Sequence, residues 1–125
     1  MSTINPFGKK LITVETDFCG RKLKLEVNRV GFRSSASVLV TYGDTVILGT
    51  AMVSNKNVSG MDYFPLSIDY EEKMYAAGKM SGSRFIKREG RPSDDAILIG
   101  RLIDRPIRPL WPKGYRQEVQ GVATV

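Results

Sequence analysis

The sequence predicts an α+β fold, in which a mixed β-sheet is accompanied by one main helix at about residues 93–105. Three observations predict it: short apolar segments fill the first half, apolar residues recur at helical spacing after Ser93, and an apolar segment returns near the end. The chain has 125 residues, of which 42% are hydrophobic and 26% charged. This is the size and composition of one folded domain with an apolar core.

Six segments have the pattern of strands. They are residues 11–16, 22–28, 36–42, 45–53, 64–70 and 118–125. Residues 38–40 and 46–48 are continuous apolar runs, which are typical of strands covered on both sides. Pro65 confines its segment to a sheet edge or a strand start, because proline lacks the N–H that a ladder requires. Nothing follows the last strand to pair with it, so we expect the chain to stop in mid-fold.

The predicted connections differ in length. Gly43-Asp44 indicates a tight turn, and residues 54–60 are polar and predicted to be a loop. Residues 71–90 are rich in charge and glycine. We expect a long exposed loop there, with a short helix near residues 72–77, and loops of this length are usually functional or disordered.

The predicted helix has a clear beginning and a clear apolar side. The Ser93 hydroxyl can cap it, and Asp94 and Asp95 lie in the first turn, where the helix dipole favours negative charge. Pro106 is expected to stop or kink the helix. The predicted core stripe consists of the pairs Leu98 with Leu102 and Ile99 with Ile103.

The composition excludes several kinds of site. The sequence has no histidine and one cysteine, Cys19, so a histidine-based triad, a histidine-ligated zinc and an internal disulfide are all excluded within it. Its scattered aspartates favour turn and strand-end roles over a metal site. No apolar run approaches the roughly 20 residues of a membrane span, and the N-terminal segment lacks the pattern of a signal or transit peptide. We therefore expect a cytoplasmic protein without a membrane partner.

The positive charge is concentrated in one stretch. Residues 73–116 contain eleven Lys and Arg but four Asp and Glu, an excess of +7, whereas the remainder carries −1. This distribution fits either a polyanionic partner at one surface or a basic face that serves solubility.

Within that stretch, residues 84–91 combine cations with an aromatic ring. Single-stranded nucleic acid is bound by cations at its phosphates and by an aromatic face at a base. Phe85 can equally be an anchor in an apolar core. On the following helix, Arg101, Arg105 and Arg108 share one face. We interpret this face as a solvated surface, and the alternative is that it extends the basic segment.

Three segments resemble the polynucleotide phosphorylase family: residues 72–79 (EKMYAAGK), 85–93 (FIKREGRPS) and 101–110 (RLIDRPIRPL). Residues 42–46 look like the opening of an RNase PH-type core, and the likeness covers about residues 18–125. It implies an incomplete RNase PH-like core, similar to ribosomal protein S5 domain 2. Residues 1–125 would be the N-terminal portion of the first core, without the second core, the helical segment, and the KH and OB-fold modules.

The resemblance also implies an activity. Family members degrade single-stranded RNA from its 3′ end with inorganic phosphate, release nucleoside diphosphates, and run the reverse polymerisation. They act in mRNA degradation and RNA processing as homotrimeric rings that join RNA-degradation complexes. They use Mg²⁺, whose ligands would lie outside this segment, and no catalytic residue is expected here. The residues implied to bind RNA are Phe85, Lys87, Arg88 and Arg91, and the basic surface would be extended by Arg84, Arg101, Arg105 and Arg108.

Arg84 departs from the family pattern, because many relatives have a small residue before the aromatic. We expect the fragment alone to be inactive. Two alternatives stay open: a non-catalytic RNA-binding module, and a smaller RNase PH-like exoribonuclease, which the loop at residues 87–93 fits less well.

Overall fold

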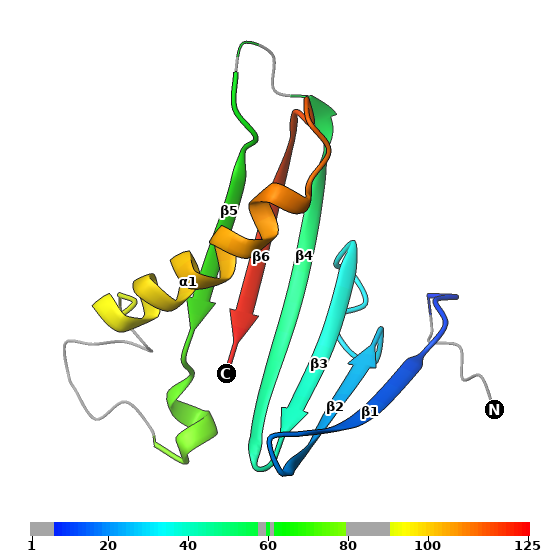
Figure 1. Cartoon of the computed structure of the whole chain (residues 1–125), viewed down its shortest axis with the longest axis vertical. Helices are drawn as coiled ribbons and strands as arrows, with labels where there is room; N and C mark the ends of the chain where they lie inside the picture. Colours follow the sequence, from blue (N-terminus) through cyan, green and yellow to red (C-terminus); the bar gives the residue numbers. More distant parts are fainter. Residues whose placement is uncertain (1–6, 58–59, 61, 80–90) are drawn as a thin grey trace.

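A computed structural model describes residues 7–57, 60, 62–79 and 91–125, and it shows one twisted sheet with a helix laid across it (Figure 1). The strands are β1 (Ile12–Phe18), β2 (Arg21–Val27), β3 (Ala36–Tyr42), β4 (Thr45–Asn57), β5 (Leu66–Glu71) and β6 (Gln117–Thr124). The helices are the short 3₁₀ turns η1 (Met74–Ala77) and η2 (Arg108–Leu110) and the α-helix α1 (Asp94–Ile107). The predicted α+β class with a mixed sheet and one main helix is confirmed.

The sheet combines a meander with one crossover. Its strand order is β1-β2-β3-β4-β6-β5, and every neighbouring pair is antiparallel except β5 and β6, which are parallel. The β1–β2 turn places both of its central residues, Cys19 and Gly20, at positive φ (49° and 78°), the geometry that matches the twist of a two-residue hairpin. The crossover from β5 to β6 carries η1, α1 and η2, so it is this connection that brings the helix onto the sheet (Figure 1).

Strand bounds agree with the sequence prediction to within two residues except at the end of β4. The polar composition of residues 54–60 predicts a loop, whereas β4 continues to Asn57. The reason is tertiary: after a register shift beyond Val53, Asn57 pairs with Gln117 of β6. Pairing with a neighbour therefore outweighs the polar composition of this segment.

The last strand is an interior strand, which corrects a second expectation. β6 lies between β4 and β5 and pairs with both of them, so it does not lack partners. Val119 at its start is 3% exposed and is one of two buried apolar residues among those the structure describes. Pro65 immediately precedes β5, which is an edge strand as the proline predicted.

The two faces of the sheet differ in character. Strand register places Val14, Leu25 and Val40 on one face and Glu15, Lys24 and Glu26 on the other. Helix α1 covers the β5 end of the sheet (Figure 1). Val46 and Met52 remain 46% and 48% exposed, so coverage of β3 and β4 on both sides, as their apolar runs predicted, is not found in the described part of the chain.

Helix α1 begins as predicted and packs differently from the prediction. The Ser93 hydroxyl accepts a hydrogen bond from the N–H of Ala96 at 3.1 Å, which confirms the cap. The residues that face the sheet are the small ones, Ala96 and Gly100, which are buried, whereas Leu98 and Leu102 are 61% and 69% exposed. The predicted stripe is therefore wrong for the leucine pair, while Ile99 and Ile103 are half-buried.

Pro106 neither stops nor delimits the helix. It lies inside α1, which reaches Ile107 and continues into η2. The proline removes one backbone hydrogen bond of the last turn, and the helix nevertheless continues through it.

Candidate nucleic-acid interface

Of the predicted RNA-binding residues, the structure describes Arg91, which lies at the entry to α1. Phe85, Lys87, Arg88 and the flanking Arg84 fall at residues 80–90, outside the described residues. On either side of that segment, Lys79 and Arg91 are exposed, and Arg91 stands two residues before the Ser93 cap. Both cations are therefore accessible to a ligand, as contact with phosphates requires, and Arg91 lies at the entry of α1.

The three arginines of the predicted basic extension have different surroundings in the structure. Arg101 and Arg105 are exposed, and Arg101 also lines a groove between α1 and β5. Arg108, at the first position of η2, reaches sideways to the start of β5 instead. The structure thus leaves Arg101 and Arg105 exposed and assigns Arg108 a different set of contacts.

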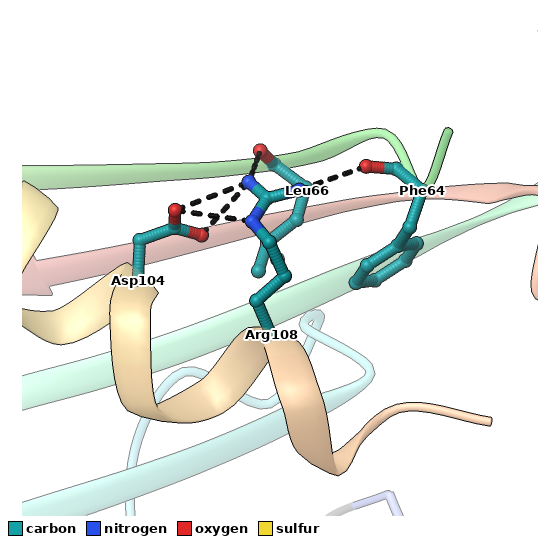
Figure 2. Close-up of polar contacts among 4 residues, drawn as sticks. All are labelled: Phe64, Leu66, Asp104 and Arg108. Atoms are coloured by element: carbon teal, nitrogen blue, oxygen red, sulfur yellow. Dashed lines mark hydrogen bonds and ion pairs between the residues drawn. The ribbon is translucent and has the colours of Figure 1, made fainter. Parts of the chain in front are cut away.

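Arg108 holds four hydrogen-bond acceptors around one guanidinium group (Figure 2). Its Nη2 donates to Asp104 Oδ1 at 2.9 Å and its Nε donates to Asp104 Oδ2 at 3.2 Å. Its Nη1 donates to the carbonyl of Phe64 at 3.0 Å, and Nη2 also donates to the carbonyl of Leu66 at 3.2 Å. The planar guanidinium suits this forked arrangement, which an ammonium could not reproduce.

The groove between α1 and β5 has a volume of about 390 Å³. Residues 66–71 of β5 form one wall, and α1 contributes Ala96, Gly100 and Asp104 to the other. The approach is closest at Gly100, where a Cβ atom would lie 3.2 Å from the carbonyl oxygen of Ile68. The helix therefore rests on the backbone of the edge strand through a residue with no side chain.

An aromatic cluster that sequence reasoning missed lies next to Arg108. Phe64, Trp111 and Tyr115 have ring centroids 4.8–5.5 Å apart, in tilted or edge-on arrangements. Such pairs are favourable beyond the area they bury. The spacing of Trp111 and Tyr115 was a visible signal, but Phe64 is too distant in sequence for any local pattern to connect it.

The described residues contain no group of three or more Asp, Glu, Cys or His that could hold a metal ion. Among the same residues, no helix combines the length and apolar composition that a membrane crossing needs.

Residues 20–125 match the model of the "3′ exoribonuclease family, domain 1" (RNase PH). The chain belongs to this 3′ exoribonuclease family. The match covers the whole sheet except β1, together with the crossover that carries α1. Membership confirms the resemblance that residues 72–79, 85–93 and 101–110 suggested.

Individual members of the 3′ exoribonuclease family agree with this assignment. The chain is 61% identical over 111 residues to a polyribonucleotide nucleotidyltransferase of Desulforamulus reducens and 58% identical over 109 residues to one of Heliobacterium modesticaldum. These matches cover 89% and 87% of this chain but 15% of each relative. The chain thus spans about 15% of the length of these relatives.

Proposed function

We propose that the intact protein is a phosphorolytic 3′-to-5′ exoribonuclease of the polyribonucleotide nucleotidyltransferase type. It degrades single-stranded RNA with inorganic phosphate to nucleoside diphosphates and runs the reverse polymerisation. This chain supplies RNA binding and threading. The observation that carries the proposal is the placement of Arg91, Arg101 and Arg105 on exposed positions at and after the entry of α1, in a member of the 3′ exoribonuclease family.

The binding role follows from the chemistry of these residues. Lys87, Arg88 and Arg91 neutralise phosphates of the RNA strand, and Phe85 stacks on a base. Arg84 adds charge beside them, and Arg101 and Arg105 continue the positive surface along α1. Because phosphates and aromatic stacking are common to all RNA, this surface binds single strands with little regard for sequence.

Catalysis belongs to the rest of the intact enzyme. It uses Mg²⁺ and inorganic phosphate, which are held outside these 125 residues, and we propose a homotrimer in the cytoplasm that takes part in mRNA degradation and RNA processing. These 125 residues alone are inactive. We propose that they form the N-terminal portion of the first RNase PH-like core, and that the second core, the helical segment, and the KH and OB-fold modules belong to the rest of the intact protein.

A second candidate function is a non-catalytic RNA-binding module. The observation in its favour is the lack of a metal-binding cluster among the described residues. A smaller RNase PH-like exoribonuclease is a third reading, which the relatives' length and the loop at residues 87–93 favour less.

The test of RNA binding uses the intact enzyme with Lys87 and Arg88 both replaced by Ala. We expect weaker binding of single-stranded RNA of any sequence. The slope of log affinity against log salt should fall by about 0.7 for each phosphate that is no longer neutralised. Phe85→Ala should cost about 1–3 kcal/mol of binding free energy with little change in slope. Fluorescence anisotropy across a salt series measures both quantities.

The matched control replaces Lys22 and Arg33 by Ala. These cations are exposed and lie outside the basic stretch, so the control removes the same net charge at a distance from α1. It should leave affinity and slope close to those of the unchanged enzyme. Normal RNA binding by the Lys87/Arg88 variant at every salt concentration would refute the role of the basic segment.

A further inference from the structure

The contacts of Arg108 join two segments that are distant in sequence. Asp104 lies one helical turn before Arg108, whereas Phe64 and Leu66 belong to the start of the edge strand, 44 and 42 residues earlier. We call Arg108 and Asp104 the latch. Its side chains are 42% and 26% exposed, so it lies at the surface, where local unfolding and ligand binding can both affect it.

The latch binds the outer edge of β5. The carbonyls of Pro65 and Glu71 accept hydrogen bonds from Val119 and Val125, so the odd-numbered residues of this strand face β6. Backbone groups alternate along a strand, which directs the carbonyls of Phe64 and Leu66 away from β6. Arg108 therefore ties the C-terminal end of α1 to an edge that has no neighbouring strand among the described residues.

The packing of α1 on the sheet uses small and partly covered side chains. Its buried residues are Ala96 and Gly100, Ile99 and Ile103 are half-buried, and Leu98 and Leu102 face solvent. Small side chains let the helix lie close to β5. They interlock weakly with the strand, however, and so restrain rotation of the helix little. The directional hydrogen bonds of the latch supply that restraint at one end.

The opposite end of α1 carries Arg91, the proposed phosphate contact that the structure describes. The helix has 14 residues and is therefore about 21 Å long, so a pivot of about 10° at the latch moves the entry of α1 by about 4 Å. A displacement of that size exceeds the tolerance of a phosphate hydrogen bond.

We propose that Arg108, held by Asp104, is a positioning residue for RNA binding: it fixes the direction of α1 and so places Arg91, at the entry of α1, against the RNA strand. The inference rests on the proposed function. It takes Arg108 out of the predicted phosphate-binding surface, because Nε, Nη1 and Nη2 all donate within the protein.

The test measures the affinity of the intact enzyme for single-stranded RNA across a salt series, at a temperature where circular dichroism shows each variant folded. Arg108→Ala should weaken binding about five- to tenfold, the range of a modest coupling between sites. The salt slope should stay unchanged, because the cations that neutralise phosphates are all retained. Arg108→Lys keeps the charge but loses the fork, and it should not restore affinity.

Asp104→Asn separates positioning from simple electrostatics. This change removes a negative charge beside a basic surface, so electrostatics alone predicts tighter RNA binding. The latch predicts weaker binding, by a factor similar to that of Arg108→Ala. The double variant should be no weaker than either single variant, because both break the same unit. Arg105→Ala is the matched control on the exposed side of the helix, and it should lower the salt slope.

Two results would overturn the latch. One is wild-type affinity in folded Arg108→Ala and Asp104→Asn variants, which means a structural role alone. The other is a slope lowered by about 0.7 in Arg108→Ala, which means a direct phosphate contact. If Arg108→Ala does not fold, Asp104→Asn decides. If the Lys87/Arg88 variant loses RNA binding and the latch variants do not, the latch alone is refuted. If the Lys87/Arg88 variant binds RNA normally, the proposed function is refuted, and the latch with it.

Discussion

Glu26 is the carboxylate that the fold shields most among the described acidic residues. It is 5% exposed, it forms an ion pair and hydrogen bond with Arg29, and its Oε1 lies 3.3 Å from Nζ of Lys24. Burial raises the pKa of its carboxyl group, but the hydrogen bonds from Arg29 and Lys24 and their positive charges outweigh it, so the pKa lies below the ordinary value of 4.5.

This lowered pKa makes a prediction about acid stability. A group with a depressed folded-state pKa stabilises the fold above its unfolded pKa, and the contribution is lost as the pH falls through the folded value. Glu26→Gln should therefore be less stable than the unchanged chain at pH 7, and the difference should shrink below about pH 4.5. Urea unfolding followed by the fluorescence of Trp111, the single tryptophan, measures this.

The control for Glu26 is Glu15→Gln. The side chain of Glu15 is 53% exposed and its Oε1 lies 3.8 Å from Nζ of Lys24, so it shares a partner with Glu26 but remains solvated. Its removal should change stability little at any pH, since exposed ion pairs contribute little. Equal losses in both variants, or a loss independent of pH, would contradict the assignment.

Local chemistry made some residues predictable and left others hidden. The role of Ser93 was predicted because a cap involves atoms three residues away. The link between Arg108 and the start of β5, and the packing of Phe64 on Trp111, were not, because these partners lie more than 40 residues apart in sequence. The residues proposed to bind RNA came from a family resemblance, and Phe85, Lys87 and Arg88 lie outside the described residues, so those roles stay predictions.

At the scale of elements, α1 shows why a hydrophobic pattern can mislead. Leu98 and Leu102 had the spacing of a core stripe, yet the helix packs through Ala96 and Gly100. The small residues form the contact with β5 because they let the helix approach the backbone of this strand, with Gly100 against the carbonyl of Ile68. Periodicity records which residues are apolar, but the closest approach depends on which are small.

Gly100→Val tests this packing. The added side chain has to displace a backbone carbonyl, because even its Cβ would lie 3.2 Å from Ile68 O. Overpacking of this kind typically costs about 1–3 kcal/mol. The better helix propensity of valine over glycine recovers a few tenths of a kcal/mol. We expect a lower urea midpoint in the Trp111 assay.

Leu98→Val is the matched control on the solvent side of the same helix. Its side chain is 61% exposed, so the free energy of unfolding should change by less than about 0.5 kcal/mol. A Gly100 variant as stable as the unchanged chain would show that α1 can lift from β5 at no cost.

At the scale of the whole molecule, the strand order could not be deduced from local patterns. The hairpins β1–β2 and β3–β4 follow from short turns. The insertion of β6 between β4 and β5 joins residues 60 or more positions apart on one side, and no periodicity encodes it. The α+β class was predictable, whereas the parallel pair that positions α1 was not.

The fold also leaves one sheet face partly open. Ile12, Val14 and Phe18 of β1 are 45–56% exposed, on the face that carries Leu25 and Val40. These partly exposed apolar side chains form a surface that another segment of protein can cover. It agrees with a chain that spans about 15% of the length of its relatives.

The central claim is that the intact protein phosphorolyses RNA while these 125 residues supply binding alone. The direct test incubates 3′ single-stranded RNA with Mg²⁺, with and without inorganic phosphate, and identifies the released nucleotides. We expect nucleoside diphosphates from the intact enzyme in the presence of phosphate, a lower rate at limiting RNA in the Lys87/Arg88 variant, and no release by the isolated chain. Nucleoside monophosphates formed without phosphate, or sustained diphosphate release by the isolated chain after repurification, would contradict the claim.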